Sequence, residues 1–225
     1  MKTELLSNVS HDIKTPLTSM ITYVDLLKHE GLESENAPEY LRIIDEKTLR
    51  LKELTENLFE AAKASSGNIP CDIQRIDLIA IVNQALGEME LKLKESSLSV
   101  IVKNTLEDSY VLADGKLLWR VIENLLSNVS KYALPGSRVY IDIFEASDDK
   151  ILMEVKNVSK DELNIPAEEL MERFKRGDES RNTEGSGLGL AIAKDLTILM
   201  GGIFEISIDG DLFKASVMLK KAGEN

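Results

Sequence analysis

The sequence predicts a two-domain α+β protein. Residues 1–66 are expected to form a helical hairpin that pairs with a second copy as a dimeric four-helix bundle. Residues 67–225 are expected to form an α/β sandwich, in which helices cover one face of a mixed sheet. Two observations predict this division. Up to residue 61, apolar residues recur at the helical steps of three and four. After the small and turn-forming residues 64–70, segments with strand-like alternation are interspersed with helical segments.

The composition narrows the class of protein. The chain has 225 residues, 43% of them hydrophobic, which is enough for an ordinary core. Its formal net charge of −12 argues against a nucleic-acid partner. No apolar run approaches the ~20 residues that a membrane crossing needs. The single cysteine, Cys71, excludes a disulfide framework and suits a reducing compartment, and two histidines are too few for a His-rich metal centre. A soluble, cytoplasmic protein is therefore expected.

The first helix is expected to end at Gly31, and the polar, turn-rich residues 31–38 should fold the chain back antiparallel. Its apolar seam is already present at Leu5 and Leu6, so we expect the chain to be part of a longer protein. The seam comprises Leu6, Val9, Ile13, Met20, Val24 and Leu27.

The second helix carries the clearest heptad, interrupted only by Lys47. Its apolar members are Tyr40, Ile44, Leu51, Leu54, Leu58 and Ala61. A two-helix hairpin alone buries little surface, so pairing with a second copy is the economical arrangement. The alternative is that the apolar stripe docks on the rest of its own chain.

The second domain is predicted from alternating helix and strand signals. Helices are expected at 78–95, 114–132, 166–173 and 187–200. Strands are expected at 100–103, 110–113, 138–144, 151–156, 203–208 and 214–219. The late strands follow one another as hairpins, which predicts a mixed, partly antiparallel sheet.

A histidine on the first helix is the first candidate functional residue. His11 lies ~200° around the helix from the core position Ile13, so it should point outward. Asp12 can accept the Nδ1 proton of His11, which leaves the other ring nitrogen available as a nucleophile. Pro16 removes a backbone N–H and is expected to bend the helix. The alternative is an ordinary solvated histidine.

A glycine-rich loop and an asparagine-bearing helix form the second candidate site. Residues 185–190 read Gly-Ser-Gly-Leu-Gly-Leu, which is neither a P-loop nor a dinucleotide fingerprint, but backbone N–H groups at such a helix start can cradle phosphate. Asn124, Asn128 and Lys131 recur at helical spacing within 114–132, where amide oxygens suit a divalent cation and the ammonium suits phosphate. Close packing at the glycines and solvated polar residues on the helix are the alternatives.

These motifs, in this order, resemble those of the sensor histidine kinases of two-component systems, whose ATP-binding domain has the Bergerat-type fold. The resemblance implies that His11 is phosphorylated, that Asp12 assists, and that Thr15 positions water for removal of phosphate from a partner protein. It implies an ATP and Mg²⁺ site in which Asn128 and Asn124 hold the metal and Glu123 is an auxiliary base. The remaining nucleotide-binding residues that it implies are Lys131, Tyr132, Phe174, Arg176, Gly185, Gly187, Leu188 and Gly189.

One motif departs from the family pattern. The family has Asp-x-Gly-x-Gly at the strand end that recognises adenine, whereas residues 157–161 here read Asn-Val-Ser-Lys-Asp. Asn157 can accept the same hydrogen bond through its amide oxygen, but without charge assistance. Weaker ATP binding is therefore expected.

The resemblance implies ATP-dependent autophosphorylation of His11 and phosphotransfer to an aspartate on a response-regulator receiver domain, accompanied by phosphatase activity toward that regulator. It further implies a homodimer whose parent protein is tethered to the cell membrane, with this part on the cytoplasmic side. A dimeric signalling scaffold with impaired ATP binding is the alternative function. An ATPase of the Hsp90 or MutL type ranks last, because His11 has no role in it.

Overall fold

The computed structural model describes the backbone of residues 2–65, 69–147, 149–171 and 187–223, and in the first two helices the side chains of residues 13–63. The chain divides into two compact units, Met1–Glu60 and Ala61–Asn225. The predicted domain boundary between residues 66 and 67 falls outside the described residues and stays a prediction.

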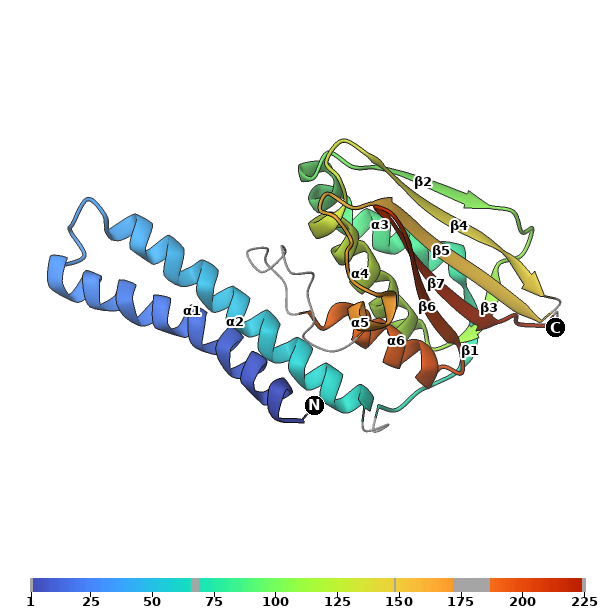
Figure 1. Cartoon of the computed structure of the whole chain (residues 1–225), viewed down its shortest axis with the longest axis horizontal. Helices are drawn as coiled ribbons and strands as arrows, with labels where there is room; N and C mark the ends of the chain where they lie inside the picture. Colours follow the sequence, from blue (N-terminus) through green and yellow to red (C-terminus); the bar gives the residue numbers. More distant parts are fainter. Residues whose placement is uncertain (1, 66–68, 148, 172–186, 224–225) are drawn as a thin grey trace. The chain divides into compact units, whose positions relative to one another are not determined.

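The first unit is a helical hairpin of α1 (Lys2–Glu30) and α2, which begins at Ala37 and continues to Ser65 (Figure 1). Gly31 ends α1 as predicted, with a φ of +83° and its N–H donating to Leu27 O at 2.9 Å. The turn is shorter than predicted, because Pro38 already lies in the first turn of α2, where a missing N–H costs nothing. Helix α1 runs without interruption through Pro16.

The two helices contact each other at Met20 and Tyr40, which were predicted to do so, and at Tyr23, which was not. The rings of Tyr23 and Tyr40 lie 5.5 Å apart, and the Tyr40 hydroxyl donates to Glu30 Oε1 at 3.1 Å. The predicted heptad of α2 is half-buried along its length, and Ala61 is 2% exposed. Another stripe on α1 is exposed, and it includes Val24, which was predicted to lie in the seam: Leu17 is 43%, Ile21 55% and Val24 37% exposed.

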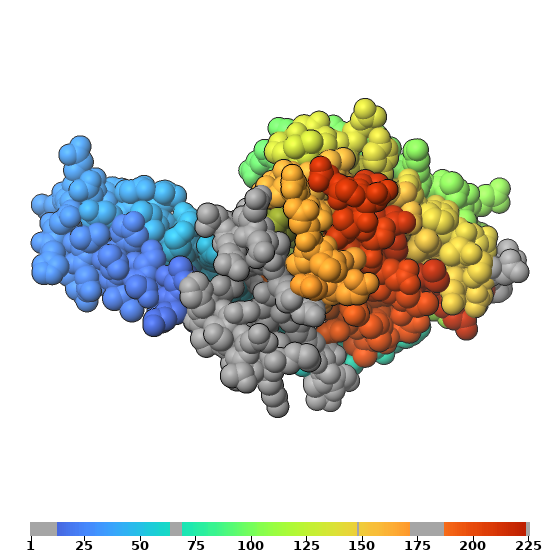
Figure 2. Space-filling model, in the orientation of Figure 1, coloured from blue at the N-terminus to red at the C-terminus, as the bar shows by residue number. Residues whose placement is uncertain are grey.

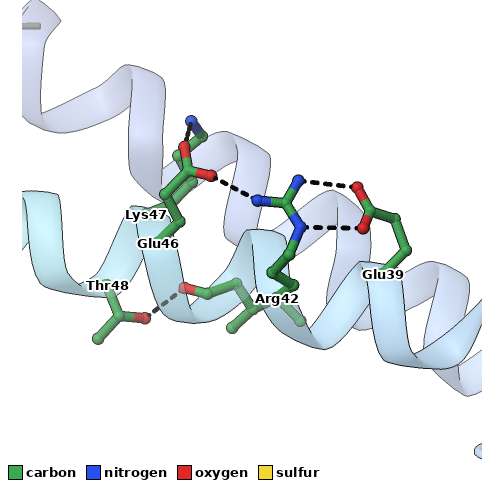
Figure 3. A network of polar contacts seen from close by, with 6 residues as sticks. Glu39, Arg42, Glu46, Lys47 and Thr48 are labelled. Carbon is green, nitrogen blue, oxygen red and sulfur yellow. Dashed lines mark hydrogen bonds and ion pairs between the residues drawn. The ribbon is translucent and has the colours of Figure 1, made fainter. Parts of the chain in front are cut away.

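The solvent side of α2 carries an ion-pair network around Arg42 (Figure 3). The Arg42 guanidinium donates to both carboxylate oxygens of Glu39, at 2.8 and 2.9 Å, and lowers the pKa of that carboxyl. It also reaches Glu46 at 3.2 Å, and Lys47 contacts Glu46 at 2.6 Å. Apart from the half-buried Lys47, these side chains are largely exposed, so each pair stabilises the helix by only about 0.5 kcal/mol or less.

The second unit is built on a five-stranded sheet of order β2-β4-β5-β7-β6. Only the β2/β4 pair is parallel, so the sheet is mixed, as predicted. Strand β1 (Gln74–Asp77), which was not predicted, pairs with β3 (Tyr110–Ala113) in a separate two-stranded sheet. The strands of the main sheet are β2 (Ser99–Asn104), β4 (Arg138–Ser147), β5 (Lys150–Val158), β6 (Ile203–Asp209) and β7 (Leu212–Lys220).

Helices α3 (Leu78–Glu95), α4 (Gly115–Tyr132) and α6 (Gly189–Leu199) lie on one face of this sheet (Figure 1). This arrangement confirms the predicted fold class. The short α5 (Ala167–Leu170) packs against β6, and the orange segment that contains it lies at the surface beside the red C-terminal strands (Figure 2).

The core lies between the sheet and these helices. Alternate residues of each strand are buried toward the helices; in β5 these are Ile151, Met153, Val155 and Asn157. The buried face of α4 includes Leu118, Ile122 and Leu125, each 1% exposed or less. Burying each such side chain contributes about 1.5–3 kcal/mol. No helix among the described residues is long and apolar enough to cross a membrane.

Candidate functional site

Helix α4 begins on a buried carboxylate. Asp114 Oδ1 accepts hydrogen bonds from the N–H groups of Lys116, at 2.9 Å, and Leu117, at 3.2 Å, which satisfies the free donors of the first turn. Its Oδ2 accepts from the N–H of Asp72 at 2.9 Å. Asp114 therefore joins the chain that precedes β1 to the start of the helix that bears Asn124 and Asn128.

Asn124 lies on the buried side of α4 and is held in one orientation. It is 9% exposed, and its Nδ2 donates to Arg120 O at 2.8 Å. Because the amide nitrogen is engaged, the carbonyl oxygen Oδ1 is left on the opposite side of the group.

The start of α6 lies directly against that oxygen. A Cβ placed on Gly189 would be 3.1 Å from Asn124 Oδ1, so glycine is what allows this close approach. The preceding residue, Leu188, is 1% exposed, and Gly187 has a φ of +64°. The tertiary structure thus brings together two motifs that lie 65 positions apart, at the N-terminal end of a helix, where backbone N–H groups favour anions.

Asn128, Lys131 and Tyr132 follow on α4 and are all half-buried. Among the described residues, the Asn128 side chain has no hydrogen-bond partner. Tyr132 O accepts the N–H of Lys160 at 2.9 Å, and the Lys160 ammonium lies 5.9 Å from the Tyr132 ring centroid. The chain after β5 is therefore fastened to the C-terminal end of α4, close to these polar residues.

Asn157 is the polar member of a buried strand face, and its amide is only half used. The residue is 3% exposed, and its Nδ2 donates to Val158 O at 3.2 Å, whereas its Oδ1 has no hydrogen-bond partner among the described residues. The same Val158 carbonyl accepts the N–H of Leu134 at 2.8 Å. A buried acceptor without a partner is costly unless a bound molecule supplies a donor.

Glu123 has a partner that the sequence reasoning missed. Its carboxylate is ion-paired with Arg120, three residues earlier on α4, and both side chains are 28% exposed. Charged residues three apart on a helix are neighbours, so the i, i+3 spacing could have revealed the pair. The carboxylate predicted as an auxiliary base is thus engaged with a guanidinium.

The remaining predicted site residues are placed only in part. Phe174, Arg176 and Gly185 lie outside the described residues. His11 and Asp12 are in α1, and their side chains are likewise outside the description. Thr15, one turn after His11, is exposed. Within the described chain, no cluster of three or more His, Cys, Asp or Glu could hold a metal ion, so a cation near α4 would depend on amide and ligand oxygens.

Two protein-family models match the chain. Residues 1–67 match the His Kinase A (phospho-acceptor) domain. Residues 113–221 match the histidine kinase-, DNA gyrase B- and HSP90-like ATPase. The first match contains His11, and the second contains α4, Asn157 and the start of α6.

Curated relatives align along nearly the whole chain. Sensor protein VanSC of Enterococcus gallinarum is 31% identical over all of this chain and 62% of its own length. Sensor protein VanS of Enterococcus faecium is 33% identical over 89% of this chain and 52% of its own. Sensor histidine kinase WalK of Bacillus subtilis is 30% identical over 92% and 34%. The chain therefore spans about a third to three-fifths of the length of these relatives.

Solved structures share the fold. The histidine kinase AdeS of Acinetobacter baumannii superposes with a TM-score of 0.77 over 95% of this chain and 98% of that chain, at 17% identity. Full-length ShkA, in complex with AMPPNP, gives a TM-score of 0.71 over 99% of this chain and 47% of its own, at 19% identity. Histidine kinase ThkA, in complex with the response regulator protein TrrA, gives 0.70 over 97% and 61%, at 19% identity. With a phospho-acceptor domain followed by an ATPase domain, and with sensor kinases as its relatives, the chain belongs to the sensor histidine kinase family of two-component systems.

Proposed function

We propose that this chain transfers the γ-phosphoryl group of ATP to His11 and then passes it to an aspartate on the receiver domain of a response regulator. The observation that carries the proposal is the close approach of Gly189 to Asn124, in the same unit as the half-used amide of Asn157. Phosphoryl transfer needs positioning and charge neutralisation more than covalent chemistry from the protein. These neutral groups supply the positioning, and Lys131 and a bound Mg²⁺ would supply the charge.

The residues fit a nucleotide with its cation. Asn157 Oδ1 can accept a hydrogen bond from the exocyclic amino group of adenine, which would satisfy the orphaned acceptor. The amide oxygens of Asn128 and Asn124 suit Mg²⁺, and Lys131 suits phosphate. The bound Mg²⁺ would neutralise phosphate charge, which matters in a chain of net charge −12. The N–H groups from Gly187 to Gly189, together with Phe174, Arg176 and Gly185, complete the proposed nucleotide site.

The phospho-acceptor group is His11. Asp12 orients the imidazole and accepts its proton, so that the other ring nitrogen is free to attack phosphorus. Thr15 lies four residues after His11 on an uninterrupted helix, hence on the same side of α1, and is exposed. That position supports its role in holding the water that removes phosphate from the regulator. Glu123, ion-paired with Arg120, serves as the auxiliary base near the nucleotide.

The proposed assembly is a homodimer formed by the hairpin. The exposed stripe of Leu17, Ile21 and Val24 has the four-three spacing of a helix–helix seam, and a second hairpin would bury it as a four-helix bundle. The solved ThkA–TrrA complex supports a receiver domain as the second partner. We further propose that the parent protein is tethered to the membrane, with this part on the cytoplasmic side, and that it binds no nucleic acid.

Radiolabelling tests the proposal. Incubation of the chain with γ-labelled ATP and Mg²⁺ should give an acid-labile protein label that His11→Ala abolishes. His29→Ala is the matched control, because it removes the only other histidine and should leave the label intact. Label that persists in His11→Ala would contradict the assignment.

A signalling scaffold is the second candidate function, because the Asp-x-Gly-x-Gly motif is absent and Asn157 occupies its place. Calorimetry with an ATP analogue and Mg²⁺ separates the two functions. A kinase gives saturable heat that Asn128→Ala removes, whereas a scaffold gives none.

A further inference from the structure

A row of four apolar side chains crosses the face of the main sheet that points away from the helices. The row is formed by direct cross-strand partners: Phe144 opposes Leu152, Leu152 opposes Met218, and Met218 opposes Ile203. The chain neighbours of Leu152 and Met218 are buried toward the helices, so the row faces the other way. None of the four is buried, and Ile203 is 43% exposed. With strands about 4.8 Å apart, the row is ~14 Å long.

A pair of cations borders one side of this row. Lys150 and Lys220 are direct cross-strand partners on β5 and β7, two residues along each strand from Leu152 and Met218. Like charges directly opposite each other destabilise a sheet. In the described part of the chain, neither ammonium has a carboxylate within ion-pair distance.

The same two strands contain an internal comparison. Lys156 and Lys214 are also direct cross-strand partners, but Glu154 lies within 2.9 Å of the first ammonium and 3.3 Å of the second. The chain thus neutralises one lysine pair with its own carboxylate. The other pair, Lys150 and Lys220, is left for an anionic group from outside the described residues.

The opposite border of the row is acidic. Asp142 and Glu154 lie on this border, and both are ion-paired with Lys156. Glu205, on the edge strand β6, lies on the same border; it is exposed and has no ion pair among the described residues. The row therefore has a cationic border on one side and an anionic border on the other, about 7 Å from its centre, since two strand residues span ~6.8 Å.

We propose that this face docks an amphipathic helix of a partner protein, with the helix's apolar stripe along the row and its carboxylates over Lys150 and Lys220. At 1.5 Å per residue, ~10 residues, or three turns, cover the ~14 Å row. A helix is about 10–12 Å across with its side chains, so its flanking residues reach both borders. The order of the borders sets the orientation about the helix axis, with basic residues of the partner toward Glu205.

The proposed surface lies on the opposite side of the sheet from α4 and α6, and therefore from the candidate nucleotide site (Figure 1). Docking there leaves the nucleotide site accessible. A second copy of this chain is disfavoured as the occupant, because the copies are proposed to pair through the exposed stripe of α1. A membrane surface is disfavoured because one border of the row carries carboxylates, which the anionic surface of a membrane would repel.

A defined helical peptide tests the proposal on the complete chain. The probe is a stapled, fluorescein-labelled 14-residue helix with a leucine stripe, glutamates along one border and lysines along the other. Its control is a peptide of the same composition in an order that breaks the stripe. Anisotropy should show saturable binding of the first peptide alone, weakened at least about tenfold by the double variant Lys150→Glu/Lys220→Glu. Ile203→Ser should also weaken it and, at an edge strand, should leave the thermal unfolding curve nearly unchanged.

Lys92→Glu is the matched charge control, since Lys92 is exposed on α3 and has no ion pair among the described residues. It should leave the affinity within about twofold of wild type. The proposal is overturned if the double variant binds as tightly as wild type, or if the stripe-bearing peptide binds no better than its control. Binding to vesicles rich in anionic lipid without peptide binding would assign the face to a membrane. Lysine-dependent association of dimers in sedimentation, again without peptide binding, would assign it to a second copy.

Discussion

Asn157→Asp restores the acidic residue that the family has at this position, and the structure predicts that the change is costly here. Asn157 is 3% exposed, and its Nδ2 donates to Val158 O at 3.2 Å. The substitution replaces that donor with a second acceptor, so a carboxylate oxygen faces a carbonyl oxygen. Loss of the hydrogen bond costs about 1 kcal/mol, and a buried carboxylate without a cation adds about 2 kcal/mol or more. We therefore expect the free energy of unfolding to fall by about 3 kcal/mol at neutral pH.

The loss should depend on pH in a defined direction. Burial raises the pKa of the introduced carboxyl above the value of about 3.9 that it has in the unfolded chain. Below that unfolded value the group is protonated in both states, so the charge penalty is absent. The penalty grows as the pH rises from the unfolded to the folded pKa, and it is complete above the folded pKa.

Urea unfolding at pH 4 and pH 8 measures this change. Asn83→Asp is the matched control: Asn83 is exposed on α3, and the same chemical change there should alter stability by no more than about 0.5 kcal/mol. Nucleotide binding gives an independent readout, because inosine triphosphate lacks the amino group that Asn157 is proposed to recognise. Wild type should prefer ATP, and the charged acceptor in the variant should increase that preference about fivefold. Equal stability of variant and wild type at pH 8, with an unchanged nucleotide preference, would refute the reasoning.

Two further predictions concern the contacts of α4. Burial works to raise the pKa of Asp114, but the N–H groups of Asp72, Leu117 and Lys116 outweigh it and lower the pKa; Asp114→Ala should therefore cost about 1–2 kcal/mol of unfolding free energy at pH 7. Because the pKa of Asp114 is lower in the folded than in the unfolded chain, its contribution to stability is complete above the unfolded pKa and disappears as the pH falls through the folded pKa. A stability difference between wild type and variant that is as large at pH 2 as at pH 7 would contradict this. Gly189→Ala should displace Asn124, whose Oδ1 would lie 3.1 Å from the new Cβ, and weaken Mg-ATP binding in calorimetry while changing stability by less than about 1 kcal/mol. Gly87→Ala is the control: Gly87 lies in a helix, and a Cβ there would have nothing within 4 Å, so the change should stabilise the protein by up to about 1 kcal/mol and leave ATP affinity unchanged. Equal ATP affinity in the two alanine variants would contradict the proposed contact.

The elements with strong local signals were predictable from the sequence. The helix predicted at 78–95 is observed as Leu78–Glu95, and the strand at 110–113 as Tyr110–Ala113. Strand β1 was missed, because the four residues Gln74–Asp77 have no apolar alternation and are held by pairing with β3. The start of α2 was misplaced because Pro38, read as part of a turn, suits the first turn of a helix equally well.

The sequence alone determined the two-domain fold class, the order of the motifs and the residue types of the candidate site, since helical and strand periodicities and short motifs are local properties of the chain. The tertiary structure alone decided that Gly189 lies against Asn124 and that Asn157 is buried, with its amide oxygen lacking a partner among the described residues. It also aligned the apolar row with a lysine pair across β5 and β7 that no carboxylate of the described residues neutralises. These features depend on which residues of distant segments become neighbours, and strand register and helix packing set that.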